Sequence, residues 1–284
     1  MSEPISKPSP PRPSGQPPNG RPPRTATAPT QHGGISRGLQ TAAHKIAIFG
    51  GAGIGKSALA ANLSQVGLEP LFLDLESGTK FLDVARIEPA TWDELRAVLH
   101  DSELLQPFGA VVIDSGTRAE ELALAWTLAN IKHEKGHSVT SIEGYGFGKG
   151  LTHLYETFMQ LLGDLDAVAR SGRHIVVICH DCVTTVPNPA GEDFVRWEPR
   201  LQSPASGKFS IRHRLREYVD HLFFIGYDVA VDTDGKGKGS GTRAIYTQER
   251  PSHMAKSRTL SETIIYSKGS ADLWRALLNK ENES

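Results

Sequence analysis

The feature that most constrains the fold of this 284-residue chain is a glycine-rich octapeptide at residues 50–57, Gly-Gly-Ala-Gly-Ile-Gly-Lys-Ser. It matches the pattern G-x-x-x-x-G-K-[ST] at every fixed position. Residues 46–49 before it form an apolar run typical of a short buried strand, and residues 58–63 after it are typical of a helix that ends near Gly67. A strand, this loop and a helix in succession predict an α/β domain with a phosphate-binding loop.

The residue types of the loop suit a nucleoside triphosphate. Glycines let the backbone curl tightly, so that consecutive N–H groups point inward at a phosphate, and the N-terminus of the following helix adds a partial positive charge. Lys56 can reach the β- and γ-phosphates, and the Ser57 hydroxyl can hold Mg²⁺. The dinucleotide fingerprint G-x-G-x-x-G, begun at Gly51, would need glycine in place of Lys56. We therefore expect ATP and Mg²⁺ as ligands, with the nucleotide bound by Gly50, Gly51, Ala52, Gly53, Ile54, Gly55, Lys56, Ser57 and Ala58.

Apolar runs typical of strands alternate with helical patterns along the rest of the chain. The expected strands are residues 70–76, 108–115, 175–179, 222–225 and 244–246, and the expected helices are 91–100, 122–129, 151–165 and 211–222. A polar loop at 132–150 and a hairpin at 183–197 interrupt this alternation. The order predicts one three-layer α/β domain over residues 41–284, built around a mostly parallel sheet.

Composition sets residues 1–40 apart from this domain. Ten of the 18 prolines fall within the first 30 positions, which predicts a disordered tail, either simply solvated or serving as a tether or weak nucleic-acid-binding arm. The tail carries five basic residues and one acidic residue, so its net charge is +4. Because the formal net charge of the whole chain is −1, the rest of the chain carries −5. Nucleic acid would therefore need a local basic patch. No apolar run approaches the roughly 18 residues of a membrane span and no signal peptide begins the chain, so we expect a cytoplasmic protein without membrane contact.

Acidic residues end two of the expected strands. Asp114 closes the run Ala-Val-Val-Ile-Asp, and Glu76 closes the strand that follows the loop and its helix. The carboxyl ends of parallel strands line the ligand crevice of such a sheet, so both carboxylates should face the phosphates. We expect Asp114 to hold Mg²⁺ together with Ser57. Glu76 is the expected general base for the attacking water, with Asp74 as the alternative.

The strand at 175–179 leads into the sequence Cys-His-Asp-Cys. His180 should enter the same crevice and sense the γ-phosphate, the alternative being a purely structural histidine. Cys179 and Cys182 form a C-x-x-C pair, but a thioredoxin-like motif would begin a helix, whereas the residues that follow look extended. A zinc site would need a second ligand pair. Buried thiols beside a strand end are the favoured interpretation.

Two groups of basic residues lie late in the chain. The first faces a single nearby acid, Glu198, and has Trp197 and Phe209 available to stack on bases; it consists of Arg196, Arg200, Lys208, Arg212, Arg214 and Arg216. It is a candidate nucleic-acid patch or an ordinary solvated face. Lys256 and Arg258 follow an expected strand and could reach the nucleotide of a neighbouring subunit, or be plain surface cations.

These motifs, in this order over roughly residues 44–275, resemble the RecA-like ATPase superfamily. They most closely resemble the phage-encoded, AAA-type nucleotide-binding proteins of the short RecA class linked to single-strand annealing and recombination. The resemblance implies that Glu76 is the catalytic base and that Lys256 and Arg258 complete the site of a neighbour in a homo-oligomer. It also implies DNA binding by the loops at 132–150 and 183–210. The strand-end sensor is more commonly glutamine, so His180 departs from the pattern.

The function expected from the resemblance is Mg²⁺-dependent ATP hydrolysis by an oligomer acting on single-stranded DNA in phage recombination or replication. The alternative is an NTPase motor or assembly factor that acts on protein partners without DNA, which the acidic body favours. A kinase is less consistent with the sequence, because no arginine-rich lid is evident.

Overall fold

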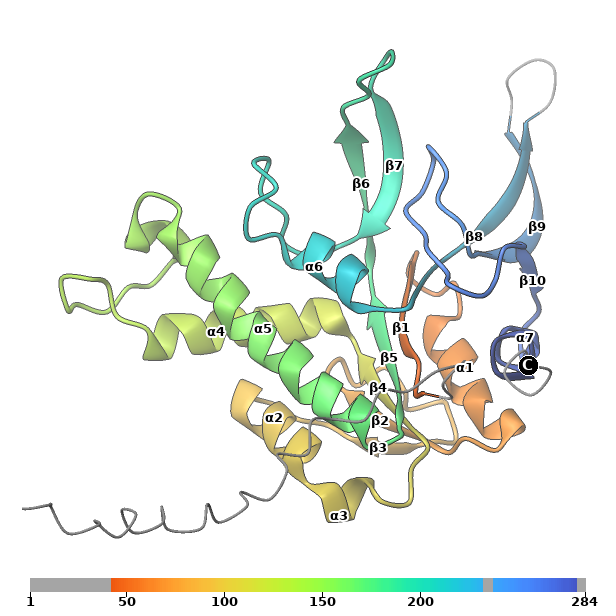
Figure 1. Ribbon diagram of the computed structural model, residues 1–284, viewed down its shortest axis with the longest axis horizontal. Helices are drawn as coiled ribbons and strands as arrows, with labels where there is room; N and C mark the ends of the chain where they lie inside the picture. Colours follow the sequence, from red (N-terminus) through yellow and green to blue (C-terminus); the bar gives the residue numbers. More distant parts are fainter. Residues whose placement is uncertain (1–41, 232–236, 280–284) are drawn as a thin grey trace, which may run out of the picture. The chain divides into compact units, whose positions relative to one another are not determined.

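The computed structural model describes residues 42–231 and 237–279, and within them the chain forms an eight-stranded sheet (Figure 1). The strand order is β10-β9-β8-β1-β5-β4-β2-β3. Pairing is parallel from β8 across to β3, whereas β9 is antiparallel to both β8 and β10. The strands are β1 Lys45–Gly50, β2 Pro70–Asp74, β3 Ala85–Ile87, β4 Ala110–Asp114, β5 His174–Cys179, β8 His221–Val231, β9 Gly237–Tyr246 and β10 Ile264–Tyr266. The expected mostly parallel sheet is confirmed; the expected tail at 1–40 lies outside the described residues.

Helices cover both faces of this sheet, which gives three layers. In β1, Ala47 and Phe49 belong to one hydrophobic core and Ile46 and Ile48 to the other, because successive strand residues point to opposite faces. The first core is closed by α2 Trp92–His100, α3 Ser102–Leu105, α4 Gly116–Asn130, α5 Lys149–Arg170 and α6 Ile211–Tyr218. The second is closed by α1 Lys56–Ala61, the 3₁₀ helix η1 Asn62–Val66 and α7 Asp272–Asn279.

Local sequence accounts for several element boundaries. Thr91 caps α2 by accepting the N–H of Glu94 at 3.2 Å, and the Glu94 carboxylate accepts the N–H of Ala90 at 2.8 Å. These two hydrogen bonds form the expected capping box, except that the Glu94 carboxylate accepts the N–H of Ala90, one residue before the N-cap residue Thr91. Gly67 ends η1 with φ 82°, as its left-handed preference predicts. No helix within the described ranges is long and apolar enough to cross a membrane.

Two expectations about secondary structure need correction, and some elements were not predicted. The segment at 132–150 carries a 3₁₀ turn, η2 Ile142–Tyr145, and the buried Tyr145 hydroxyl lies 2.6 Å from the Ile131 carbonyl oxygen, so tertiary packing orders part of an expected loop. The helix expected at 211–222 ends at Tyr218, because Leu222 belongs to β8. The elements β3, α3, β10 and α7 were not predicted; the first three have only three or four residues, too few to show a periodic pattern.

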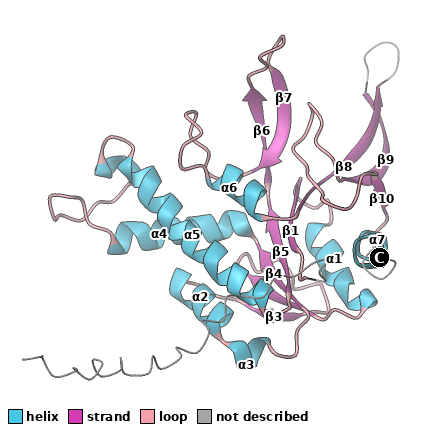
Figure 2. Cartoon of the chain, viewed as in Figure 1, coloured by secondary structure: helices cyan, strands magenta, loops and turns pink. Residues whose placement is uncertain are grey.

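The expected hairpin forms a separate two-stranded sheet (Figure 2). It consists of β6 Asp181–Val186 and β7 Phe194–Pro199, with Val183 opposite Trp197. Because β6 follows β5 after a single residue, the hairpin stands at the carboxyl edge of the main sheet. Its base is therefore adjacent to the phosphate-binding loop.

At the opposite edge of the sheet, three histidines lie together. His44 lies between His174 and His221, with nitrogen–nitrogen distances of 3.1 Å from the His44 amide to His174 Nδ1 and from His221 Nε2 to His44 Nδ1. Burial lowers the pKa of His174 and of His221 to about 4. The folded protein therefore keeps the imidazoles of His174 and His221 neutral at a pH where the unfolded chain, with a histidine pKa of about 6.5, takes up protons.

We expect stability to fall as the pH drops from about 6.5 toward 4, with His221 alone contributing about 2 kcal/mol of loss at pH 5. Urea unfolding at pH 7 and pH 5 measures this loss. The His221→Asn variant should lose correspondingly less stability between the two pH values than the unaltered chain. Equal losses in both proteins would contradict the assignment.

Candidate nucleotide site

The phosphate-binding loop joins β1 to α1 at the carboxyl edge of the sheet. Gly50 has φ 154°, and a Cβ there would lie 2.3 Å from the Ile225 carbonyl oxygen, so no other residue fits. The Lys56 ammonium is buried and donates to the carbonyls of Gly50 and Gly51, at 2.8 and 3.0 Å. Burial lowers the pKa of Lys56, against the opposing effect of the Asp114 charge. The lysine is thus held at the mouth of the loop.

Ser57 and Asp114 meet beside this lysine. The Ser57 hydroxyl donates to Asp114 Oδ2 at 2.5 Å, so the two oxygen groups lie together. Burial is the main factor that raises the pKa of Asp114, and the charges of Asp74 and Glu76 raise it further. A hydroxyl and a crowded carboxylate fit Mg²⁺, which prefers oxygen ligands and takes few from protein when phosphates supply the rest.

Glu76 is held by two other strand-end residues. The Ser115 hydroxyl donates to Glu76 Oε1, and His180 Nε2 lies 2.9 and 3.0 Å from the two carboxylate oxygens. Partial burial acts to raise the pKa of Glu76, but the hydrogen bonds from Ser115 and His180 outweigh it, so the pKa is lowered. Glu76 is therefore ionised at neutral pH and points in a defined direction.

Sequence reasoning named Glu76 and His180 but not Ser115. Ser115 also caps α4 by accepting the N–H of Arg118 at 3.1 Å, so its place is set by the helix as well as by Glu76. The sequence signal that could have identified Ser115 was its position directly after the strand-end residue Asp114. His180 is fixed in turn, because its backbone N–H donates to the Thr117 hydroxyl at 3.1 Å.

Asp74, the alternative base, is occupied by the loop that follows β2. Its carboxylate accepts the N–H and hydroxyl of Thr79, at 2.9 and 2.6 Å, and the N–H of Gly78 at 3.0 Å. These hydrogen bonds lower the pKa of Asp74 in spite of burial, which acts to raise it. Asp74 therefore shapes the turn that presents Glu76, and the role of Glu76 as the base stays a prediction.

The basic residues expected to form a nucleic-acid patch are largely paired with acids. Arg196 and Arg212 both bind Glu198, at 2.6 and 2.5 Å, and have side chains only 10 and 11% exposed. Glu249, which is distant in sequence, binds Arg196 at 2.7 Å and also binds Arg216. Of the other three, Arg214 pairs with Glu217 at 3.3 Å, whereas Arg200 and Lys208 are exposed.

Lys256 and Arg258 lie away from the phosphate-binding loop of their own chain. Lys256 pairs with Leu222 near the start of β8, and its ammonium donates to the Arg216 carbonyl at 2.7 Å. Arg258 contacts Asp220 at 3.2 Å with a side chain 67% exposed. Their role toward a neighbouring subunit stays a prediction.

Of the two cysteines, Cys179 is buried in β5 and Cys182 is half-buried; neither is in a disulfide. Burial raises the pKa of Cys179 to about 12, so its thiol stays protonated and unreactive.

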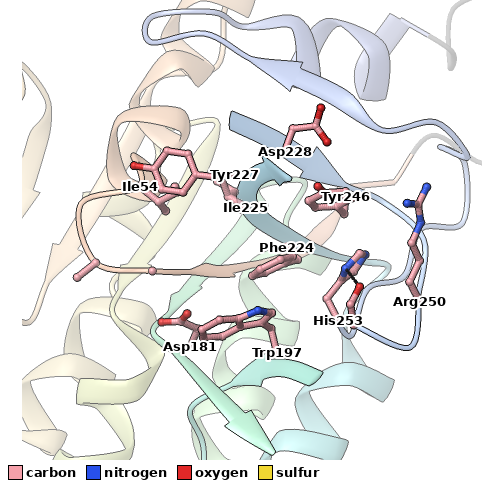
Figure 3. A pocket seen from close by; sticks show the side chains of 14 residues that line it. Ile54, Asp181, Trp197, Phe224, Ile225, Tyr227, Asp228, Tyr246, Arg250 and His253 are labelled. Carbon is pink, nitrogen blue, oxygen red and sulfur yellow. Dashed lines mark hydrogen bonds between the residues drawn. The ribbon is translucent and has the colours of Figure 1, made fainter. Parts of the chain in front are cut away.

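An aromatic pocket of about 560 Å³ adjoins the outer side of the phosphate-binding loop (Figure 3). Loop residues Gly51, Ala52 and Ile54 form one wall. The opposite walls carry stacked rings, with centroids 6.3 Å apart for Trp197 and Phe224 and 5.8 Å apart for Phe224 and Tyr246; His253 and Arg250 complete them. Trp197 is 42% exposed, so its ring remains accessible from solvent.

The sheet order, the loop and the strand-end acids define a P-loop NTPase of RecA-like fold. A family model described as AAA domain matches residues 42–259, which is most of the chain, and the protein belongs to this family. Membership implies nucleotide binding and ATPase activity. No curated protein matches the sequence.

Proposed function

We propose that the protein is a Mg²⁺-dependent ATPase in which Glu76 activates the attacking water. The main observation that supports this proposal is that Ser115 and His180 orient the Glu76 carboxylate at the same sheet edge as Lys56 and Asp114. Phosphoryl transfer needs an aligned water and stabilised charge more than covalent chemistry. All the required groups come from this one edge.

Each residue has a distinct task in this proposal. The loop amides and Lys56 bind the β- and γ-phosphates, and the lysine exchanges its bonds to loop carbonyls for bonds to phosphate oxygens. Mg²⁺, held by Ser57 and Asp114, would neutralise charge on the phosphates. Glu76 accepts the proton of the attacking water, and its lowered pKa keeps it ready as a base. His180 orients Glu76 through Nε2.

Removal of the metal or of Asp114 tests this function. We expect ATP turnover with Mg²⁺, none with EDTA, and a fall in kcat of about 100-fold for Asp114→Asn, because the metal loses its charged partner. The control Asp93→Asn changes an exposed acid on α2 and should keep full activity. Turnover that persisted in EDTA would contradict the proposal.

For the biological role, we propose single-stranded DNA as the partner of a homo-oligomer acting in phage recombination or replication. The aromatic pocket supports this, because an accessible tryptophan can stack on an unpaired base and Arg200 and Lys208 lie exposed on the segment that follows it. In such an oligomer Lys256 and Arg258 would reach the nucleotide of a neighbour.

DNA-stimulated ATP hydrolysis at low salt tests this role. We expect the double variant Arg200→Glu/Lys208→Glu to bind single-stranded DNA at least tenfold more weakly while its ATP affinity is unchanged. These positions are better probes than Arg212 and Arg216, because both of those arginines are already ion-paired, Arg212 with the buried Glu198 and Arg216 with Glu249. Arg170→Glu at the end of α5, an exposed arginine outside this segment, is the control. A rate of ATP hydrolysis that is the same with and without single-stranded DNA would favour a motor or assembly factor acting on proteins.

A further inference from the structure

Two side chains, one from β9 and one from β10, donate hydrogen bonds to backbone carbonyls of the phosphate-binding loop. Arg243 of β9 donates from Nη1 to the Ile54 carbonyl at 2.9 Å, and Tyr266 of β10 donates from its hydroxyl to the Gly55 carbonyl at 2.9 Å. The guanidinium carbon of Arg243 lies 5.0 Å from the centroid of the Tyr266 ring, so the two side chains support each other. Neither residue is part of the sequence motif.

The fit at Gly55 is close. Gly55 has φ 108°, and a Cβ there would lie 2.9 Å from the Tyr266 hydroxyl and 3.1 Å from Arg243 Nη1. The last glycine of the motif is therefore required by the side chains that cover it as well as by its backbone conformation.

These hydrogen bonds set the direction of loop amides. In a planar trans peptide the C=O of one residue and the N–H of the next point in opposite directions. Holding the Ile54 carbonyl outward therefore turns the Gly55 N–H inward. The Gly55 carbonyl also accepts the Leu59 N–H of α1 at 2.9 Å, and the Tyr266 hydroxyl holds it in the same outward direction, so the Lys56 N–H points inward too. The Lys56 N–H, in the first turn of α1, has no acceptor within its helix and is available to a phosphate.

Tyr266 comes from a part of the chain that the family match does not cover. The match ends at residue 259, and the segment that follows packs along α1 and η1. Trp274 is fully buried and donates from Nε1 to the Leu59 carbonyl at 2.7 Å, while Asn62 donates to the Ser270 carbonyl at 2.9 Å. The segment thus holds both the loop and the helix behind it.

We propose that Tyr266 and Arg243 are positioning residues of the nucleotide site, which keep the loop amides aimed at the phosphates before the nucleotide arrives. The C-terminal segment 260–279 is then a functional part of the site. This inference rests on the proposed function only in assuming that the loop binds phosphates. Preorganised donors bind more tightly because no ordering cost remains.

The variants Tyr266→Phe and Arg243→Met test the inference in the full-length chain, with ADP and inorganic pyrophosphate as probes in calorimetric titrations. We expect Tyr266→Phe to weaken both ligands by the same factor of about five and Arg243→Met by about ten, the values for a neutral and a charged hydrogen bond. KM for ATP should rise while kcat stays nearly constant. The control Tyr218→Phe removes a hydroxyl that has no hydrogen-bond partner among the described residues and should change neither affinity.

Each other result has a definite meaning. Weaker ADP binding with unchanged pyrophosphate binding would show contact with the base or sugar and overturn the inference. Unchanged affinities, with or without a lower melting temperature, would also overturn it, since the contacts would then be only structural. If the unaltered chain bound neither ligand, the proposed function would fail and the inference with it.

Discussion

Glu76→Gln is expected to lower kcat for ATP hydrolysis by about 10²- to 10⁴-fold, the range for losing a positioned general base. Glutamine keeps the size of the side chain and can still accept a hydrogen bond from Ser115, but it cannot take a proton from water. The Kd for ATP should stay within about threefold, because the loop and Lys56 supply the binding. Steady-state hydrolysis and equilibrium titration separate these two quantities.

A matched control lies at the other end of the same strand. Glu69 is exposed just before β2, so Glu69→Gln makes the same chemical change away from the nucleotide and should leave kcat unaltered. If Glu76→Gln kept more than a tenth of the activity while Asp74→Asn, correctly folded, lost it, the two carboxylates would have to exchange roles.

The second large effect is expected for Lys56→Ala, which should raise the Kd for ATP by about 100-fold or more. A charged hydrogen bond contributes about 1.5–3 kcal/mol, and the ammonium can make more than one to the phosphates. The variant also loses the bonds to the Gly50 and Gly51 carbonyls that hold the loop mouth in the free protein. Equilibrium titration with ATP measures the loss.

Lys132→Ala, which removes an exposed lysine, is the control for charge alone. A melting curve without nucleotide shows whether Lys56→Ala is still folded. A folded Lys56→Ala protein with the ATP affinity of the unaltered chain would rule out the assigned role of the loop.

The parts of the site that could be predicted from the sequence are those set by local patterns. The octapeptide at 50–57 identified the loop, and apolar runs ending in acids placed Asp114 and Glu76 at strand ends. In a parallel sheet all such ends share one edge, so a local run was enough to bring distant residues to one crevice. The alternation of strands and helices likewise predicted the three-layer fold.

Partners far apart in the sequence were decided only by the tertiary structure. The contacts of Glu76 with His180, of Arg216 with Glu249 and of Gly55 with Tyr266 depend on strand order and on which loops fold back. No local periodicity encodes these choices, because they arise from the packing of whole elements. The sequence by itself determined the loop, the strand-end acids and the type of sheet. The tertiary structure decided how Glu76 is oriented, which arginines are neutralised and what holds the loop open to phosphate, since each depends on atoms brought together across the sheet.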